Sequence, residues 1–232
     1  MCHPWESGCD DSARWDGALP APWTRDRWRN HKHELLGSLQ FGDDGSAVAN
    51  DAFAVGSIGF NALVAFNALE LASLTGDEAL AASARELAET VAGRFDSERV
   101  TWVDDSPFDT GAVRTLDAYF ALLVDPNRDA AWAQLGDPRA YHGDCGPAGA
   151  HRDEPTFDPV TYWRGPAWPQ MTYLLWVAAA RCGRTEDAAR LGSALVSGAT
   201  RSGLAEYWHP DTGAGLGAIP QSCSALGTVT QI

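Results

Sequence analysis

The chain of 232 residues has no uninterrupted apolar run near the roughly 20 residues that a membrane-spanning helix needs. Residues 2–6 also lack the basic region and the apolar stretch of a secretion signal. We therefore expect a cytoplasmic protein with no membrane partner. Hydrophobic residues make up 45% of the chain and the mean hydropathy is −0.23, values typical of a soluble globular domain with a sizeable core.

Basic residues are scarce: 17 Lys and Arg stand against 31 Asp and Glu, which gives a formal net charge of −14. An acidic surface repels the phosphates of nucleic acids, so we expect no nucleic-acid partner. Paired cysteines are lacking as well, because the five cysteines are odd in number and show no C-x-x-C spacing. This pattern argues against a disulfide framework and a zinc site, and it favours free thiols in a reducing compartment.

The histidines and aspartates show no metal-binding spacing either. His3 and His209 have no cysteine or carboxylate at ligand spacing, which favours plain hydrogen-bonded histidines. Asp43, Asp44 and Asp51 lack the EF-hand spacing and fit a solvated acidic loop. We expect neither a metal ion nor an organic cofactor.

Buried and one-faced helical patterns alternate along the chain. Residues 53–74 carry one charge, Glu70, and predict a helix buried nearly all round, with a stripe formed by Phe60, Leu63, Val64, Leu71 and Leu74. Thr75 and Glu78 then have capping-box spacing, and residues 80–95 show the pattern of a one-faced amphipathic helix. The same pairing recurs at 167–182 and 188–199, with further helices at 111–124 and 129–135. Two concentric helix layers require this alternation, so we predict an all-α fold, an α/α toroid.

Three long segments do not look helical: residues 1–24 (the first loop), 136–166 (the second loop) and 202–221 (the third loop). They are rich in Gly and Pro, and each contains tryptophan. Long loops in a compact domain are usually functional, so we expect one face of the toroid to hold a site. In the first loop Trp5 and Trp15 lie among carboxylates. This mixture suits a sugar, whose C–H faces stack on indoles and whose hydroxyls bond to charged groups.

Three stretches together resemble the (α/α)6-barrel glycosidases of the processing α-glucosidase type, which include the bacterial glucosylglycerate and mannosylglycerate hydrolases. They are HPWESGCDDSARWD, FDPVTYWRGPAWPQMTYLLW and GLAEYWHPDTGAGLGA, in the family's order. The resemblance spans essentially the whole chain but only part of the family's length.

The resemblance implies that Asp10 is the general acid and Glu206 the general base of an inverting hydrolysis. About 6.5–9.5 Å between the carboxyl groups would leave room for the attacking water. A proton donor at Asp10 would need apolar surroundings and acidic neighbours to hold its proton. The positions that match the family's sugar-binding residues are Trp5, Glu6, Arg14, Trp15, Trp163, Arg164, Gly165, Trp168, Tyr207 and, in the aglycone site, Gln221. Cys9 and Cys223 depart from the family pattern, which affects the shape of the pocket.

Each assignment has a structural alternative. Asp10 fits a turn or helix-cap aspartate ahead of Ser12, and Glu206 fits an ordinary exposed glutamate. Trp163 and Trp168 fit core residues that plug the base of a helix pair, and this packing is compatible with sugar stacking.

The acid motif begins at residue 3, and about seven predicted helices compare with the twelve of a closed barrel. We therefore expect a single domain, residues 1–232, equivalent to the C-terminal part of such an enzyme. An open half-toroid would expose inner helices, which predicts self-association and weak activity unless another segment completes the ring.

The leading functional prediction is an inverting hydrolase of an α-glucosidic or α-mannosidic bond in a small glycoside or oligosaccharide. The alternative is a truncated, non-catalytic carbohydrate-binding remnant of such an enzyme. A helical protein–protein scaffold would explain the helix pairs but not the three tryptophan-bearing loops. The substrate stays open among glucosylglycerate, mannosylglycerate, trehalose-like disaccharides and short α-glucans.

Overall fold

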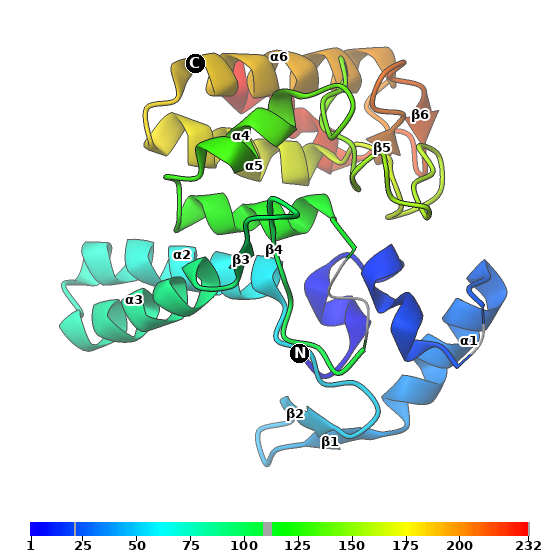
Figure 1. Cartoon of the computed structure of the whole chain (residues 1–232), viewed down its shortest axis with the longest axis vertical. Helices are drawn as coiled ribbons and strands as arrows, with labels where there is room; N and C mark the ends of the chain where they lie inside the picture. The colour runs from blue at the N-terminus through cyan, green and yellow to red at the C-terminus, as the bar shows by residue number, and fades with distance from the viewer. Residues whose placement is uncertain (21, 109–112, 232) are drawn as a thin grey trace.

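The computed structural model describes residues 1–20, 22–108 and 113–231, in which helices dominate and strands form three small hairpins (Figure 1). In chain order the elements are η1 (Pro4–Ser7), η2 (Ala13–Ala18), α1 (Arg25–Leu36), β1 (Leu39–Phe41), β2 (Ala47–Asn50), α2 (Ile58–Thr75), α3 (Glu78–Ala92), β3 (Phe95–Asp96), β4 (Thr101–Trp102), η3 (Leu116–Leu123), α4 (Asp129–Gly136), α5 (Pro169–Arg181), α6 (Thr185–Arg201), β5 (Tyr207–Trp208), β6 (Gly215–Leu216) and η4 (Ser222–Gln231). The η elements are 3-10 helices.

The helices form two layers, as the alternating pattern predicts. α2 packs against η3, η3 against α5, and α5 against η4, so these four make one continuous row. α3 pairs with α2 and α6 with α5, and in Figure 1 α3 and α6 lie on the outer sides of α2 and α5, away from η3. Each helical hairpin thus supplies one helix to the inner row and one to the outer layer.

Local signals explain where the helices begin and end. The Ser57 side chain accepts a hydrogen bond from the amide of Phe60 and caps α2, and α2 ends at Gly76 in the left-handed conformation (φ 72°). The capping box proposed for Thr75 and Glu78 is wrong. Asp77 caps α3 instead, accepting a hydrogen bond from the amide of Leu80 at 3.0 Å, because a carboxylate directly before the helix reaches that amide.

Two other elements differ from the predicted ones. The helix expected at 111–124 is the shorter 3-10 helix η3; residues 109–112, including the start of that prediction, lie outside the described part of the chain. α1, a helix of 12 residues capped by Thr24, was not predicted. It runs beside the first loop, and this places its side chains next to the acid motif (Figure 1).

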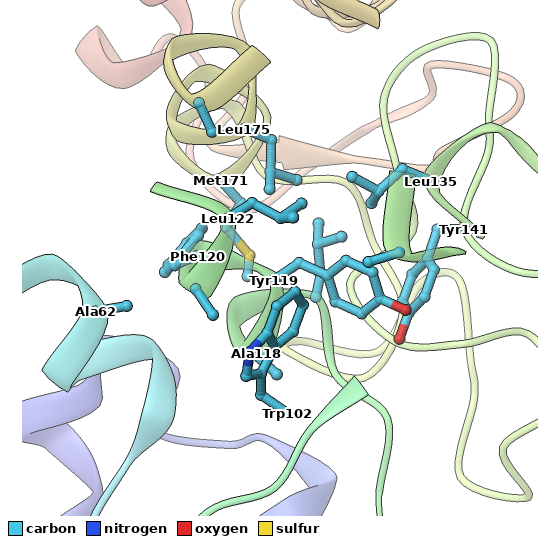
Figure 2. Close-up of a cluster of buried hydrophobic side chains, with 14 of the residues drawn as sticks. Ala62, Trp102, Ala118, Tyr119, Phe120, Leu122, Leu135, Tyr141, Met171 and Leu175 are labelled. Carbon is cyan, nitrogen blue, oxygen red and sulfur yellow. The ribbon is translucent and has the colours of Figure 1, made fainter. Parts of the chain in front are cut away.

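The main hydrophobic core lies between the layers (Figure 2). At its centre Tyr119 of η3 makes edge contacts with Trp102 and Tyr141, at ring-centroid distances of 5.8 and 4.9 Å. Leu135 of α4 and Leu175 of α5 close the cluster from the other side. A smaller core of Trp15, Trp28 and Phe53 anchors the first loop and α1.

α2 is only partly buried, which corrects the prediction of a helix covered on every side. One flank of α2 is solvent-exposed: Phe60 (41%), Val64 (44%), Leu71 (52%) and Leu74 (85%). By length and composition, α2 alone among the described helices is apolar enough to cross a membrane. It nevertheless packs against α3 and η3, as a core helix does. The exposed α2 flank lies at one end of the inner row.

Candidate active site

The acid motif is shaped by a short cap. His3 precedes η1, and its Nδ1 accepts a hydrogen bond from the amide of Trp5 at 3.1 Å. Glu6 closes the reciprocal half by accepting from the amide of His3 at 3.0 Å. Gly8 then turns the chain at φ 71°, and this turn leads directly into Cys9 and Asp10. The Glu6 carboxylate is therefore part of this cap. The sugar-binding role predicted for Glu6 stays a prediction.

Asp10 and Asp11 share one cation. The Lys32 ammonium, on α1, donates to Asp10 Oδ2 at 2.6 Å and to Asp11 Oδ1. The indole of Trp28, one turn earlier on α1, donates to the Asp10 carbonyl at 2.8 Å. Asp10 is thus neither a helix cap nor a free surface carboxylate; it is held from α1 by both its backbone and its side chain.

Glu206 lies in the third loop, next to the β5–β6 hairpin. Its amide donates to the carbonyl of Ala218, and its Oε2 accepts from the amide of Ala218 at 3.0 Å. Gly217 is needed beside it, because a Cβ at this glycine would lie 2.5 Å from Glu206 Oε2. The Glu206 side chain is half-buried and therefore positioned rather than freely solvated.

Tyr162 connects the two candidate carboxylates electrostatically. Burial raises the pKa of Tyr162 to about 12, and the negative charges of Asp10, Glu206 and Asp11 act in the same direction. Burial likewise raises the pKa of Tyr207, with Glu206 adding to the effect and Arg25 opposing it. Carboxylates from the first and third loops therefore act on the same pair of phenols.

A pocket of about 310 Å³ opens at these phenols. Its lining residues are Asp11, Trp23, Arg25, Val160, Thr161, Tyr162 and Tyr207. They come from the first loop, the start of α1, the second loop and the third loop. The prediction that these three loops gather on one face is confirmed by this lining. Carboxylate, guanidinium and aromatic groups are the partners that a glycoside needs.

Trp163 of the second loop and Trp168, directly before α5, pack against the two tyrosines that line the pocket. Trp163 and Trp168 stack at a centroid distance of 3.7 Å with 4° between their planes, and Trp168 stacks on Tyr207 at 4.5 Å. Tyr162 meets all three rings edge-on. Trp163 and Trp168 are buried, so these two indoles act as core residues here, while Tyr162 and Tyr207 line the pocket.

Comparison with known proteins identifies the family of the chain. Residues 1–224 match the family described as the mannosylglycerate hydrolase MGH1-like glycoside hydrolase domain. The chain belongs to this family. Mannosylglycerate hydrolase of Rubrobacter radiotolerans is 28% identical over 93% of the chain, and glucosylglycerate hydrolase of Mycolicibacterium hassiacum is 40% identical over 32% of it.

The fold is shared with solved structures of the family. The GH63 mannosylglycerate hydrolase of Thermus thermophilus aligns with TM-scores of 0.76 in complex with glucose and 0.78 in complex with Tris and D-glycerate. The sequence identities are 22% and 20%, and all of this chain is covered. The predicted α/α toroid is therefore confirmed. The chain spans 58% of the Rubrobacter protein and 64% of the Thermus structure with D-glycerate, so these family members are considerably longer.

Arg164 joins the first and second loops rather than pointing freely into the pocket. Its guanidinium pairs with both oxygens of Asp16, Nη1 to Oδ2 at 3.0 Å, and lies 3.6 Å from the ring centroid of Trp23. Burial raises the pKa of Asp16, and Arg164 opposes that rise. The neighbouring Gly165 has no room for a side chain, since a Cβ would lie 2.4 Å from the carbonyl oxygen of Asp158.

Arg14 and Trp15 lie in the protein interior, which corrects their predicted place in the sugar pocket. Arg14 is 3% exposed and pairs with Asp104 at 3.0 Å and with Asp117. Burial raises the pKa of Asp104, and the Arg14 charge counteracts it. Trp15 is fully buried and donates to the Cys9 carbonyl at 2.8 Å. Both residues hold the first loop in shape.

Trp5 and Gln221 are not among the pocket residues. Trp5 is exposed and packs on His3 and His33, with centroid distances of 4.6 and 6.0 Å. The backbone amide of Gln221 donates to the Leu204 carbonyl, and the side-chain oxygen of Gln221 accepts from the backbone amide of Ser222 at 2.7 Å. Their sugar-binding roles remain predictions from the family resemblance.

Sequence reasoning missed Lys32, Arg25, Trp23 and the direct role of Asp11 in the pocket wall. Arg25 and Lys32 lie on α1, the helix that was not predicted. The cap signal of Thr24 followed by Asp26 could have indicated that helix. Within the described ranges no group of three or more His, Cys, Asp or Glu side chains is placed to hold a metal ion.

Proposed function

We propose that this chain carries the acid–base machinery of an inverting glycoside hydrolase that acts on a small α-glycoside of an organic acid. The observation that supports it is a pocket of about 310 Å³ lined by Asp11, Tyr162 and Tyr207, where the charges of Asp10 and Glu206 both raise the pKa of the Tyr162 phenol. Asp10 would protonate the leaving oxygen, and Glu206 would activate the water.

The substrate class follows from the family and from one cation. The similar proteins are named for hydrolysis of mannosylglycerate and glucosylglycerate, both of which carry a carboxylate. Arg25 lies on the pocket wall and supplies a positive charge in a chain that is otherwise strongly acidic. A guanidinium there favours an anionic aglycone over a neutral sugar.

The test is hydrolysis of α-mannosylglycerate and α-glucosylglycerate by the purified chain, with the sugar anomer followed by proton NMR. Inversion releases the β-anomer first, and retention releases the α-anomer. Asp10→Asn and Glu206→Gln should each lower kcat by about 100-fold or more, since each removes one proton-transfer group. Glu78→Gln, at an exposed glutamate of α3, is the matched control and should leave the rate unchanged. Release of the α-anomer, or full activity in both variants, would contradict the proposal.

A non-catalytic sugar-binding role is the second candidate. It is favoured by the 58% span relative to the Rubrobacter protein and by the ion pair that engages Asp10. It predicts that D-glucose or D-glycerate binds, seen by calorimetry, while neither glycoside is hydrolysed. Extension of the chain to the full length of the relatives would restore hydrolysis only if the first candidate is correct.

We further propose a cytoplasmic protein without nucleic-acid or membrane partners that self-associates through the exposed α2 flank. The net charge of −14 and the apolar side chains of that flank support these proposals. Cell fractionation tests the location.

A further inference from the structure

Lys32 is the only lysine of the chain; the other 16 basic residues of the 17 are arginines. It is also one of the least accessible charges, with 6% of the residue exposed. Every other cationic position of the sequence uses a guanidinium, and many of these pair at the surface. The one lysine ammonium of the chain therefore lies next to Asp10, the candidate general acid.

The contacts of Lys32 suit an ammonium better than a guanidinium. Its Nζ is a compact point charge with three donors, which can bridge two carboxylates from adjacent residues. Nζ donates to Asp10 Oδ2 at 2.6 Å and to Asp11 Oδ1. The Lys32 carbonyl accepts from His3 Nε2 at 2.9 Å, so its backbone is fixed to the same loop.

The bridge decides which oxygen of Asp10 can carry a proton. Because Oδ2 accepts from the ammonium, a proton on Asp10 is placed on Oδ1. Asp10 and Asp11 are adjacent carboxylates, and a shared cation relieves their mutual repulsion. Trp28 of the same helix fixes the Asp10 backbone through its carbonyl, and the Lys32 bond holds the Asp10 side chain.

We propose that Lys32 is the positioning residue of the candidate active site: it clamps Asp10 and Asp11 and leaves Asp10 Oδ1 as the oxygen that meets the glycosidic leaving group. This inference rests on the proposed function for the role of Asp10, but the clamp itself can be measured without any hydrolysis. Lys32 is not among the residues that line the pocket; it acts through the two aspartates.

A single lysine permits a direct spectroscopic test. The full chain labelled with 15N-lysine gives one side-chain ammonium signal, and protection from water should make it visible at neutral pH. We expect that signal to shift or disappear in Asp10→Asn and in Asp11→Asn, and to stay in place in Glu206→Gln. If the chemical shift and intensity of the Lys32 signal are unchanged in either asparagine variant, the proposed clamp is wrong, whether or not the chain hydrolyses a glycoside.

Kinetics test the consequence for Asp10. Lys32→Met should lower kcat by about 10- to 100-fold with little change in KM, because the acid is misplaced while the sugar pocket is kept. Lys32→Arg should restore part of the rate by returning the charge. Arg29→Met removes a charge from the exposed face of the same helix and is the control. A folded Lys32→Met chain with the wild-type kcat contradicts the positioning role. Absence of hydrolysis in the wild type would contradict the proposed function, and the ammonium signal would then test the clamp alone. If Lys32→Met does not fold, the ammonium signal of the wild type and of the two asparagine variants tests the clamp instead.

Discussion

At the scale of single residues, the acid motif depends on a neutral histidine. His3 Nδ1 accepts from the amide of Trp5, so Nε2 must carry the hydrogen that bonds to the Lys32 carbonyl. Burial lowers the pKa of His3 below its ordinary value. Protonation would place a hydrogen on Nδ1 and remove the cap of η1, next to the candidate acid.

We therefore predict that acid loosens the first loop through His3. Because the folded-state pKa is lowered, the unfolded chain binds the proton first, and stability is lost as the pH falls below about 6.5. His3→Asn keeps an acceptor that does not titrate in this range, and it should weaken the pH dependence of urea unfolding between pH 7 and 5. His33→Asn on the exposed face of α1 is the control. An unchanged pH dependence in His3→Asn would show that another group is responsible.

A second residue-scale prediction concerns the close approach of backbones at Gly165. A Cβ there would lie 2.4 Å from the Asp158 carbonyl oxygen, a contact that neither backbone can relieve easily. Gly165→Ala should lower the free energy of unfolding by about 3 kcal/mol or more, measured by urea denaturation. At Gly93 the same addition meets only ordinary contacts, from 3.4 Å, so Gly93→Ala should have an effect within about 0.5 kcal/mol. Equal effects at both glycines would contradict this.

At the scale of elements, buried ion pairs attach the first loop to the helical layers. Arg14 is held between Asp104, which follows β4, and Asp117 of η3. The Asp104 carboxylate also accepts from the amide of Ile58, the first residue of α2, at 2.8 Å. One buried cluster thus joins four segments that lie far apart in the sequence.

Removing the cation should be costly because two buried carboxylates lose their partner. Arg14→Met is expected to destabilise the chain by about 3–5 kcal/mol in chemical denaturation. The double substitution Asp104→Asn with Asp117→Asn in the Arg14→Met background should recover part of this loss, since no unpaired charge remains buried. A loss below about 1 kcal/mol in Arg14→Met, the range of exposed pairs, would mean that the cluster is solvated.

The sequence predicted those helices well whose positions follow from a local pattern of apolar residues. The amphipathic pattern of residues 80–95 and the apolar segments predicted at 53–74 and 167–182 correspond to α3, α2 and α5. α1 was missed because its buried face is formed by Trp28, Lys32 and Leu35, and a lysine at a core position breaks the apolar period. Periodicity cannot identify a buried charge whose partners lie 21 and 22 residues earlier.

The same distinction applies to the candidate site. The loops that carry Asp10, Tyr162 and Glu206 were recognised as one face from their tryptophans and from the family resemblance. The predicted environment of Arg14 was wrong because nothing local to it indicates Asp104, 90 residues away. Long-range charge partners follow from the folded chain, so the exact set of pocket-lining groups required the structure.

At the scale of the whole molecule, the inner row of helices ends at α2 on one side, and its exposed flank is free of charge. Phe60, Val64, Leu71 and Leu74 are each more than two fifths exposed, and Glu70 is the one charged residue of α2. A chain of net charge −14 repels its own copies, but this flank adds no charge to that repulsion. Association through this apolar flank would therefore remove apolar surface from water without burying a charge.

We predict reversible self-association through this flank, measured by sedimentation velocity over a range of concentrations. Leu71→Glu should weaken association by about tenfold or more, because a charge buried in an apolar contact costs more than the roughly 1.4 kcal/mol that tenfold represents. Ser73→Glu adds the same charge to an exposed position of the same helix outside the apolar flank, and it should have a smaller effect. A wild-type chain that stays monomeric at every concentration and unfolds in one cooperative transition would contradict the prediction. Equal weakening by both substitutions would place the contact on another face or assign the effect to net charge alone.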